Sequence, residues 1–499
     1  MKESLDFIYK QQKELSTIGG IGALLGWDQM TYMPEKGIVE RSEQTAFLSK
    51  LAHEKIISEK FWNHIEKLSK EDTLKSLSEK DKNVVKRLKK DVEKSRKIPS
   101  DFVENFSKAT TLAYQAWEKA RKKNDFKIFS PHLEKIVNLE KKYSTYIDLP
   151  GPRYNSLLDD YEEGMTVDVL KKEFVFLKKN LTNLLEKIKN SDFYQDQKSF
   201  DKKVDAQKQE ELCNIIIKKM NLPKDRSRLD ESTHPFTTSI GNDDVRITTS
   251  FKRKSALFSL FSTIHEAGHA LYELGMPRGE YKNTAISDAP SLGLHESQSR
   301  FWENMIARSR SFWNYFFPIF KKKIPDLLKD INLDEWYRMI NIVKPSLIRV
   351  EADELTYCLH VILRFELEVD LMQDKIQVKD LPVLWNEKMD EMLGVRPKND
   401  VEGVLQDMHW SGGNFGYFPT YAIGTIYASQ ISKKLAEKQN IFEEVGKGEF
   451  KNIVLWLNKN IHCYGRLMTA DEIIKKCCGE GLNSEVFVDY LKDKYLDIY

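Results

Sequence analysis

The sequence predicts a large, mostly α-helical protein that folds as a single domain over residues 1–499. Runs with apolar side chains at helical spacing and charged side chains between them fill most of the chain. One short stretch has the composition of β-strands, and neither repeats nor a long linker interrupt the pattern. The 41% of hydrophobic residues is enough to build one large core.

Residues 1–220 carry long, charge-laced helical patterns, which we interpret as a wall or lid. The expected helices are residues 5–17, 39–68, 78–96, 100–123, 129–146, 167–189 and 201–220. A glycine-rich stretch, residues 19–29, follows the first of them. Its end, Trp27-Asp28-Gln29, is expected either to line a cleft or to make a tight helix–helix contact.

Residues 221–499 form the half that carries the chemistry. Residues 232–249 are rich in Thr and Ile and are divided by Gly-Asn-Asp-Asp, which predicts a short β-hairpin. The residues after it predict further helices. These are a helix ending near 274, one starting at 290 or 291, and residues 331–342, 351–373, 378–393, 421–437, 449–462 and 486–499.

A His-Glu-x-x-His motif, from His265 to His269, follows the expected hairpin. Residues four apart share a helix face, so His265 and His269 can bind one metal ion. Glu266 can then reach a water molecule on that ion, which is the arrangement of zinc proteases. Apolar residues at helical spacing in 254–261 place the motif on an amphipathic helix. The alternative is a buried polar pair on a core helix.

A catalytic zinc site needs a third protein ligand and an open position for water. The downstream candidates are Asp288, His295 and Glu296. We prefer Glu296, because a carboxylate from a second helix completes the His-His-Glu set of thermolysin-like enzymes. His295 points about 100° away on a helix, which leaves it behind the ligands or facing a substrate.

Peptide hydrolysis on such a site also needs a donor for the oxyanion that forms at the carbonyl. Tyr421, His234 and His409 are the available donors outside the motif. Removal of C-terminal residues would also need a cation for the substrate carboxylate, and the arginine fork suits both oxygens. Arg246 and Arg349 are the two candidates, and the residues alone do not choose between them.

The charge balance and the cysteines limit the partners and the compartment. The net charge is only +2, from 78 basic and 76 acidic residues, which argues against a nucleic-acid partner. Five scattered cysteines form no Cys-x-x-Cys pair, so reduced thiols in a cytoplasmic protein are expected. The apolar stretch near the start is too short to span a membrane.

Five motifs occur in an order that closely resembles the Taq-type thermostable metallocarboxypeptidase family. They are His234-Pro235-Phe236, Asp244-x-Arg246-x-Thr248, His265-Glu266-x-x-His269, His295-Glu296-Ser297-Gln298 and Gly403-x-x-Gln406-Asp407-x-His409-Trp410. The resemblance extends along the whole chain. Two departures are Met30 after Asp28-Gln29, where an acid is expected, and the Cys477-Cys478 pair.

The resemblance implies a helical, neurolysin-like peptidase fold with a deep cleft, and a homodimer. It implies one zinc ion per chain, or cobalt, and broad release of C-terminal residues from peptides that end in a free carboxylate. It makes His265, His269 and Glu296 the ligands and Glu266 the base. Arg349, aided by Arg246, would bind the substrate carboxylate, and Tyr421 would assist at the oxyanion. His295 and Gln298 of the same motif are assigned to the substrate side.

Two other functions compete with the carboxypeptidase. One is an endo-acting zinc oligopeptidase of similar helical shape, which would still cut a peptide whose C-terminus is blocked. The other is a helical interaction protein with a degenerate site, which the intact ligand set and base argue against.

Overall fold

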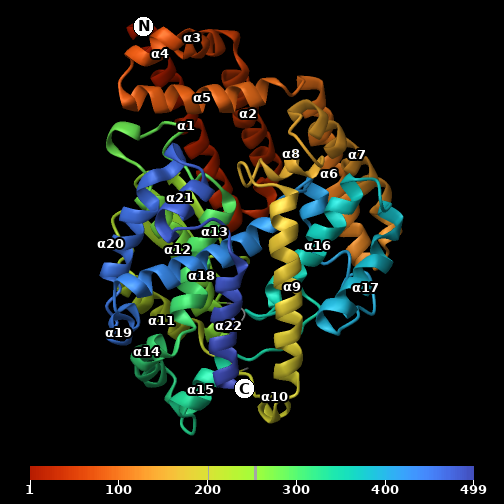
Figure 1. Ribbon diagram of the computed structural model, residues 1–499, viewed down its shortest axis with the longest axis vertical. Helices are drawn as coiled ribbons and strands as arrows, with labels where there is room; N and C mark the ends of the chain where they lie inside the picture. The colour runs from red at the N-terminus through yellow and green to blue at the C-terminus, as the bar shows by residue number, and fades with distance from the viewer. Residues whose placement is uncertain (201, 252–254) are drawn as a thin grey trace.

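The computed structural model describes residues 1–200, 202–251 and 255–499, and helices dominate it (Figure 1). Its α-helices are α1 (Lys2–Thr31), α2 (Ile38–Ile57), α3 (Glu59–Ser69), α4 (Glu71–Ser76), α5 (Glu79–Arg96), α6 (Ser100–Lys123), α7 (Ser130–Ile147), α8 (Tyr154–Leu158), α9 (Val167–Lys189), α10 (Asp192–Asp196), α11 (Ala206–Lys219), α12 (Ala256–Gly275), α13 (Leu292–Arg300), α14 (Arg310–Lys323), α15 (Leu333–Ile340), α16 (Tyr357–Met372), α17 (Leu381–Leu393), α18 (Pro419–Lys438), α19 (Ile441–Gly446), α20 (Lys451–Asn460), α21 (Ala470–Cys478) and α22 (Ser484–Ile498). In the described part of the chain, no helix combines the length and apolar character needed to cross a membrane.

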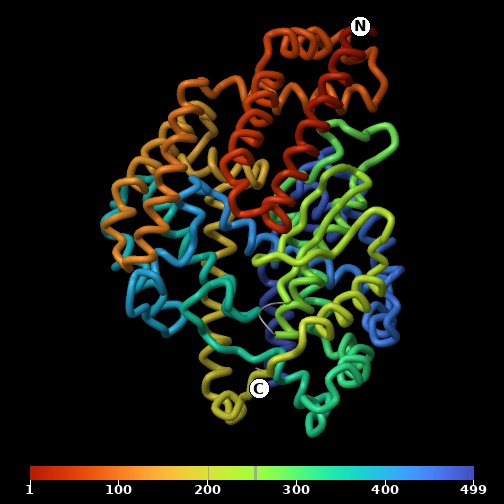
Figure 2. Tube along the Cα trace, turned by 180° about the vertical axis from the view of Figure 1, so that it is seen from behind, coloured from red at the N-terminus to blue at the C-terminus, as the bar shows by residue number. Residues whose placement is uncertain are grey.

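The helices form two sides joined by α9 and α22, which pack against each other (Figure 1). One side holds α11 to α14 and α18 to α21, and the other holds α6 to α8 with α16 and α17. Helices α1 to α5 lie across one end, and from behind α1 and α2 descend between the two sides (Figure 2). One continuous core runs from Ala113 to Ile498, so the core does not divide at residue 220.

A three-stranded sheet lies beside α12, where the sequence predicts a two-stranded hairpin. Strands β2 (Thr237–Gly241) and β3 (Asp244–Thr249) form the antiparallel hairpin. The prediction is incomplete, because β1 (Ser227–Glu231) pairs in parallel with β3 and makes the order β1-β3-β2. The polar sequence of β1 lacks a strand signal of its own, and its pairing with β3 defines it.

The observed helix bounds agree with the expected ones in part. Helices α6 and α9 have the expected bounds. The expected helix 39–68 is two helices, because Ser58 ends α2 and its side chain caps α3 at Phe61. Residues 191–199, between the expected helices 167–189 and 201–220, contain α10. The expected helix boundary at Asp201 and the start of the 254–261 pattern at Lys254 lie outside the described residues.

The glycine-rich stretch 19–29 continues α1 and brings it onto the sheet. A Cβ on Gly20 would lie 2.4 Å from the Ile240 carbonyl oxygen of β2, so only glycine allows this approach. Trp27 is buried, and the guanidinium groups of Arg246 and Arg228 lie 4.3 and 5.3 Å from its ring centroid. The contact is therefore between a helix and a sheet, and it closes one end of β2.

Two further glycines let α13 pass between its neighbours. A Cβ on Gly268 of α12 would lie 2.8 Å from the Gln298 carbonyl oxygen, and one on Gly424 of α18 would lie 2.7 Å from Cβ of Glu296. Side chains at these positions would push α13 outward. Small residues at both crossings therefore set the position of Glu296 relative to α12.

The start of α13 rests on a buried carboxyl group. Glu162 is 2% exposed, and its Oε1 accepts the backbone N–H of Gly293. Burial raises the pKa of Glu162 from 4.5 to about 8, although Gly293 and the Ser291 side chain hydrogen-bond to it. The next residue, Glu163, has a lowered pKa, because the charges of Arg87 and Lys90 outweigh its burial.

Glu162→Gln is expected to remove part of the pH dependence of stability. Because the pKa of Glu162 is raised in the folded protein, the stabilisation that Glu162 provides is fully present below its pKa in the unfolded chain. That stabilisation is lost as the pH rises toward about 8. Removing this one titrating group reduces the slope of the free energy of unfolding against pH by up to about 1.4 kcal/mol per pH unit. Denaturant titrations at pH 5 and pH 8 measure this slope.

Glu163→Gln is the matched control, because its lowered pKa predicts the opposite sign. Its stability contribution is present above the unfolded pKa and is lost as pH falls. Equal slopes between pH 5 and pH 8 for the wild type and Glu162→Gln would contradict the assignment.

Candidate metal centre and active site

Three side chains from α12 and α13 meet at one point. His265 and His269 lie one turn apart on α12, and Glu296 projects from α13. The Oε2 atom of Glu296 lies 3.7 Å from Nε2 of His265 and 3.4 Å from Nε2 of His269. One ligand atom from each residue falls within 4.8 Å of the others.

These separations fit a tetrahedral zinc-type ion. Nitrogen and oxygen ligands about 2.0–2.2 Å from such an ion stand roughly 3.3–3.5 Å apart. The donor set of two imidazoles and one carboxylate is that of catalytic zinc sites, which keep a fourth position open. The residues therefore fit a divalent metal ion.

His265 is oriented by a carboxylate on its other nitrogen. Its Nδ1 lies 2.8 Å from Oε2 of Glu303, which leaves Nε2 for the metal. Glu303 lies in a π-helical turn, η4 (Phe301–Ala307), which continues α13. Burial raises the pKa of Glu303, but His265 and Arg300 lower it to about 2. Glu303 is thus ionised and holds a proton on Nδ1 of His265.

His269 is oriented by a second histidine. Its Nδ1 lies 2.7 Å from Nδ1 of His295, and Nε2 of His295 lies 2.8 Å from Oε1 of Glu273. Burial and the charge of His295 lower the pKa of His269 to about 4, so it is neutral, as a metal ligand must be. His295 therefore lies behind the ligand set.

Glu296 is buried and ionised. Burial raises its pKa, but the charge of Arg300 and the two histidines hold that pKa well below its ordinary value. The Nε of Arg300 donates to Oε1 of Glu296 over 2.6 Å. The other oxygen, Oε2, faces the two histidines.

Glu266 lies beside the ligands and is positioned by β2. The hydroxyl of Thr237 donates to Oε2 of Glu266 over 2.7 Å. Burial raises the pKa of Glu266, and the charge of His265 lowers it less strongly. A carboxylate with a raised pKa can take a proton from water and give it up again.

A cavity of about 640 Å³ opens over this group. Its lining includes His265, Glu266 and Glu296 on one side and Arg349, Tyr357 and Tyr421 on another. Arg349 pairs with Asp407 through Nε and Nη2, over 3.1 and 2.8 Å. Its Nη1 donates to the Tyr357 hydroxyl over 3.1 Å. Arg349 is thus a fixed, buried cation in the wall of the cavity.

The structure brings Tyr421 to the cavity and places the other expected donors elsewhere. The Tyr421 hydroxyl lies 3.1 Å from that of Tyr417, whose ring stacks on His409 with 5.5 Å between centroids. Burial and the charge of Arg364 lower the pKa of His409 to about 3, so it is neutral. His234 is exposed on the turn between β1 and β2, where Pro235 lines the cavity.

Two residues that were expected to bind substrate do not line this cavity and contact other parts of the protein instead. Arg246 forms a fork-like pair with Asp244, with both distances 2.9 Å, and covers Trp27. Gln298 is buried and lies 2.9 Å from Nε2 of His462. Asp288, considered as a ligand, is exposed and lines a different cavity.

Sequence reasoning missed the residues that position the site. These are Thr237, Glu273, Arg300, Glu303 and Tyr357. Part of the signal was present, because Arg300 and Glu303 follow Glu296 by four and seven residues and so share its helix face. Thr237 has no such signal, because β2 reaches α12 only through the fold.

A helical fold with an HExxH helix, a glutamate ligand from a second helix and a buried cation in the cavity defines a metallopeptidase of the His-His-Glu class. The comparisons with known proteins agree. Residues 7–495 match the model of the carboxypeptidase Taq (M32) metallopeptidase family. The chain belongs to this family, whose members are metal-dependent carboxypeptidases.

Relatives along the full chain carry carboxypeptidase names. The chain is 40% identical to thermostable carboxypeptidase 1 of Pyrococcus furiosus, over 99% of each sequence. It is 39% identical to carboxypeptidase 1 of Bacillus subtilis, over 100% of this chain and 98% of the other. The Apo-Mg structure of Pyrococcus furiosus carboxypeptidase superposes with a TM-score of 0.95 at 39% identity, over 99% of both chains.

Glu303→Gln is expected to weaken metal binding by about 10- to 100-fold, because it removes the carboxylate that orients His265. Protein that has been freed of metal with a chelator is titrated with Zn²⁺ or Co²⁺ in the presence of a competing chromophoric chelator. The titration gives the affinity and the number of ions per chain.

Glu351→Gln is the control, because Glu351 is an exposed acid in the cavity lining and undergoes the same change of charge. Equal losses of affinity in the two variants would indicate a general charge effect and would contradict the role of Glu303.

Proposed function

We propose that this carboxypeptidase removes C-terminal residues one at a time, with broad specificity, at a site built on His265, His269 and Glu296. The proposed ion is one zinc per chain, with cobalt as a substitute. The observation that supports exopeptidase action most is Arg349, a buried cation in the same cavity as Glu266 and the ligand set.

Glu266 is the proposed proton carrier. When bound, a metal ion at the site would supply Lewis-acid polarisation of the peptide carbonyl and lower the pKa of the attacking water. Glu266 would take the proton from that water and deliver it to the leaving nitrogen. Thr237 holds Oε2 of Glu266 in one orientation, which limits the positions that the base can occupy.

Arg349 is the proposed anchor for the substrate carboxylate. Asp407 and Tyr357 fix its guanidinium, so little ordering is needed when substrate binds. The Tyr357 hydroxyl can yield its contact with Nη1 to a carboxylate oxygen. Arg246 is a weaker candidate, because it lies outside the lining of this cavity and covers Trp27.

Tyr421 is the proposed donor to the oxyanion. Its hydroxyl lies in the lining that also contains Glu266 and Arg349, and Tyr417 holds it from behind. Burial raises the pKa of Tyr421 well above its ordinary value, so it keeps its proton. A neutral hydroxyl in a buried wall can donate to a developing negative charge.

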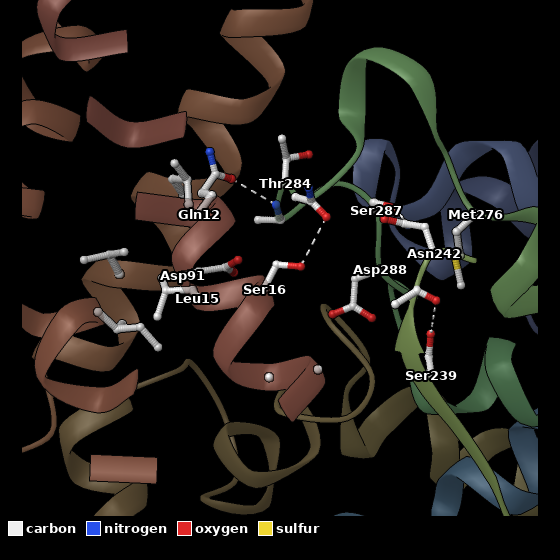
Figure 3. A pocket seen from close by; sticks show the side chains of 18 of the residues that line it. Gln12, Leu15, Ser16, Asp91, Ser239, Asn242, Met276, Thr284, Ser287 and Asp288 are labelled. Atoms are coloured by element: carbon white, nitrogen blue, oxygen red, sulfur yellow. Dashed lines mark hydrogen bonds between the residues drawn. The ribbon is translucent and has the colours of Figure 1, made fainter. Parts of the chain in front are cut away.

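The upstream part of a peptide would run along β2 toward a second cavity of about 460 Å³ (Figure 3). Thr237 beside Glu266 and Ser239 at this cavity share one face of the strand, about 7 Å apart. Ser16 of α1 and Asp288 face each other across the space in Figure 3. On this path the cavity would receive a side chain about two residues upstream of the scissile bond.

A cytoplasmic homodimer remains part of the proposal. Large apolar side chains are exposed on α1 and α2, among them Leu24 at 39% and Phe47 at 66%. Exposed apolar surface of this kind supports an interface between copies of the chain.

Metal-loaded protein is expected to shorten a peptide that ends in a free acid. The same peptide with an amidated C-terminus should stay intact. The reason is that the buried Arg349 guanidinium can pair with a substrate carboxylate but not with an amide. Arg349→Lys keeps the charge but loses the Nη1 donor, which stands outside the pair with Asp407, so the preference for the acid in kcat/KM should fall by about 10- to 100-fold. Mass spectrometry of timed digests measures both.

Arg246→Lys is the control and should keep the wild-type preference, because Arg246 lies outside the lining of the cavity. Internal cuts in both peptides would favour the endo-acting oligopeptidase. Loss of the acid preference in Arg246→Lys alone would make Arg246 the anchor.

Tyr421→Phe is expected to lower kcat by about 10²- to 10³-fold with little change in KM, because the hydroxyl acts only on the oxyanion. Tyr427→Phe on the same helix is the control. In the described part of the chain the Tyr427 hydroxyl has no hydrogen-bond partner, so its loss should leave kcat unchanged. An unchanged kcat in Tyr421→Phe would remove Tyr421 from the mechanism.

A further inference from the structure

A third cavity, of about 460 Å³, lies between α6, α7 and the segment 412–415 and shares no lining residue with the cavity over the candidate metal centre. We call it the α6–α7 cavity. Its lining consists of Ile98, Phe102, Val103, Phe106, Ser107, Thr110, Glu140, Tyr143, Leu157, Asp160, Tyr161, Gly412, Gly413, Asn414 and Phe415. It holds none of the residues proposed above for catalysis.

Aromatic rings form much of the cavity wall. Phe102 lies 5.9 Å from Phe106 and 6.4 Å from Tyr143, measured between ring centroids. Tyr161 and Phe415 add rings from two other segments. The faces of aromatic rings carry negative charge density and attract cations.

One carboxyl group in the wall lacks a partner. Glu140 of α7 is 4% exposed. Among the residues that the structure describes, none forms a hydrogen bond or ion pair with its side chain. The nearby acids are already paired: Asp160 lies 2.7 Å from Nζ of Lys94, and Glu368 accepts from Arg364 over 2.9 Å.

An unpaired buried carboxyl group is costly, so its environment calls for an explanation. Burial and the charges of Asp160 and Glu368 raise the pKa of Glu140 well above its ordinary value. The carboxyl group of Glu140 is therefore neutral while the cavity is empty. A cation beside it would favour the ionised form and would be a partner for it.

We propose that the α6–α7 cavity binds a small organic ammonium ion, with its charged head on Glu140 and its carbon atoms against the rings of Phe102, Phe106 and Tyr143. One free carboxylate among rings does not supply the six or more oxygen ligands that Ca²⁺ or Mg²⁺ prefers. The combination of aromatic faces and one acid is that of ammonium-binding cages.

The cavity size agrees with a compact ligand. A volume of about 460 Å³ lies within the usual range for small-molecule sites, about 300–1,000 Å³. The site is also next to the candidate active site. Tyr161 packs edge-on against Tyr417, with 5.5 Å between centroids, and the Tyr417 hydroxyl contacts that of Tyr421.

Calorimetric titration of the full-length protein with choline and with n-propylammonium tests the proposal. The control ligand is 3,3-dimethylbutan-1-ol, the uncharged carbon analogue of choline. At least one cation is expected to bind at least about 10-fold more tightly than this alcohol. Glu140→Gln should lower the affinity for that cation by about 10-fold or more, which corresponds to about 1.4 kcal/mol.

Two further variants separate the contributions. Glu134→Gln changes an exposed acid on the same helix and should bind as the wild type does. Phe106→Leu keeps an apolar wall but loses the ring. It should therefore lower the affinity for the cation and leave the affinity for the alcohol unchanged. Thermal unfolding of each variant checks that it is folded.

Three results would overturn the proposal. They are equal affinity for choline and the alcohol, unchanged cation binding in Glu140→Gln, and no binding of either cation at concentrations on the order of 10 mM. The site shares no residue with the proposed catalytic set, so peptide cleavage is a separate result and its failure would not affect this test.

Discussion

The candidate metal centre depends on the close approach of α13 to α12 and α18. The Glu296 carboxylate lies within 3.4 and 3.7 Å of the two histidine nitrogens only because the helix backbones nearly touch at Gly268 and Gly424. Glu162 fixes the start of α13 from a third direction. The ligand set is therefore a property of helix packing, and the HExxH spacing supplies only two of its three members.

The site also depends on a balance of buried charge. Glu296, Glu303 and Arg300 form one buried group with the two histidines, and Arg349, Asp407 and Arg364 form another below the cavity. Burying ions is costly unless partners are in place, so such groups rarely add stability. Their presence is better explained by function: each fixes the protonation state and orientation of a side chain that faces the cavity.

The sequence predicted the features that one segment encodes by itself. It missed the features that depend on contacts between segments distant in the chain. Helices α6 and α9 were predictable because their periodicity lies within each segment and their ends carry local signals, the left-handed Asn124 after α6 and the Thr166 cap before α9. Strand β1 was not, because its polar residues become a strand only by pairing with β3. The same difference separates His265 and His269, whose spacing carries the information, from Thr237 and Glu273, which reach the site through the sheet and through His295. Arg246 shows the converse, because an arginine near the motif in sequence is bound by Asp244 in the fold.

The loop from His409 to Tyr421 shows how one segment serves several requirements. Trp410 donates to Glu368, whose other oxygen accepts the N–H of Gly416 and the hydroxyl of Tyr154. Because these groups are buried and satisfied, the loop has little freedom to move independently of α16. Tyr417 and Tyr421 at its end are therefore held at a fixed distance from Arg349, whose guanidinium lies 5.0 and 5.2 Å from the ring centroids of Phe418 and Tyr421 in the same loop. The proposed mechanism needs a donor for the oxyanion and a cation for the carboxylate at a fixed spacing. A rigid shared support provides that spacing more reliably than two independent loops would.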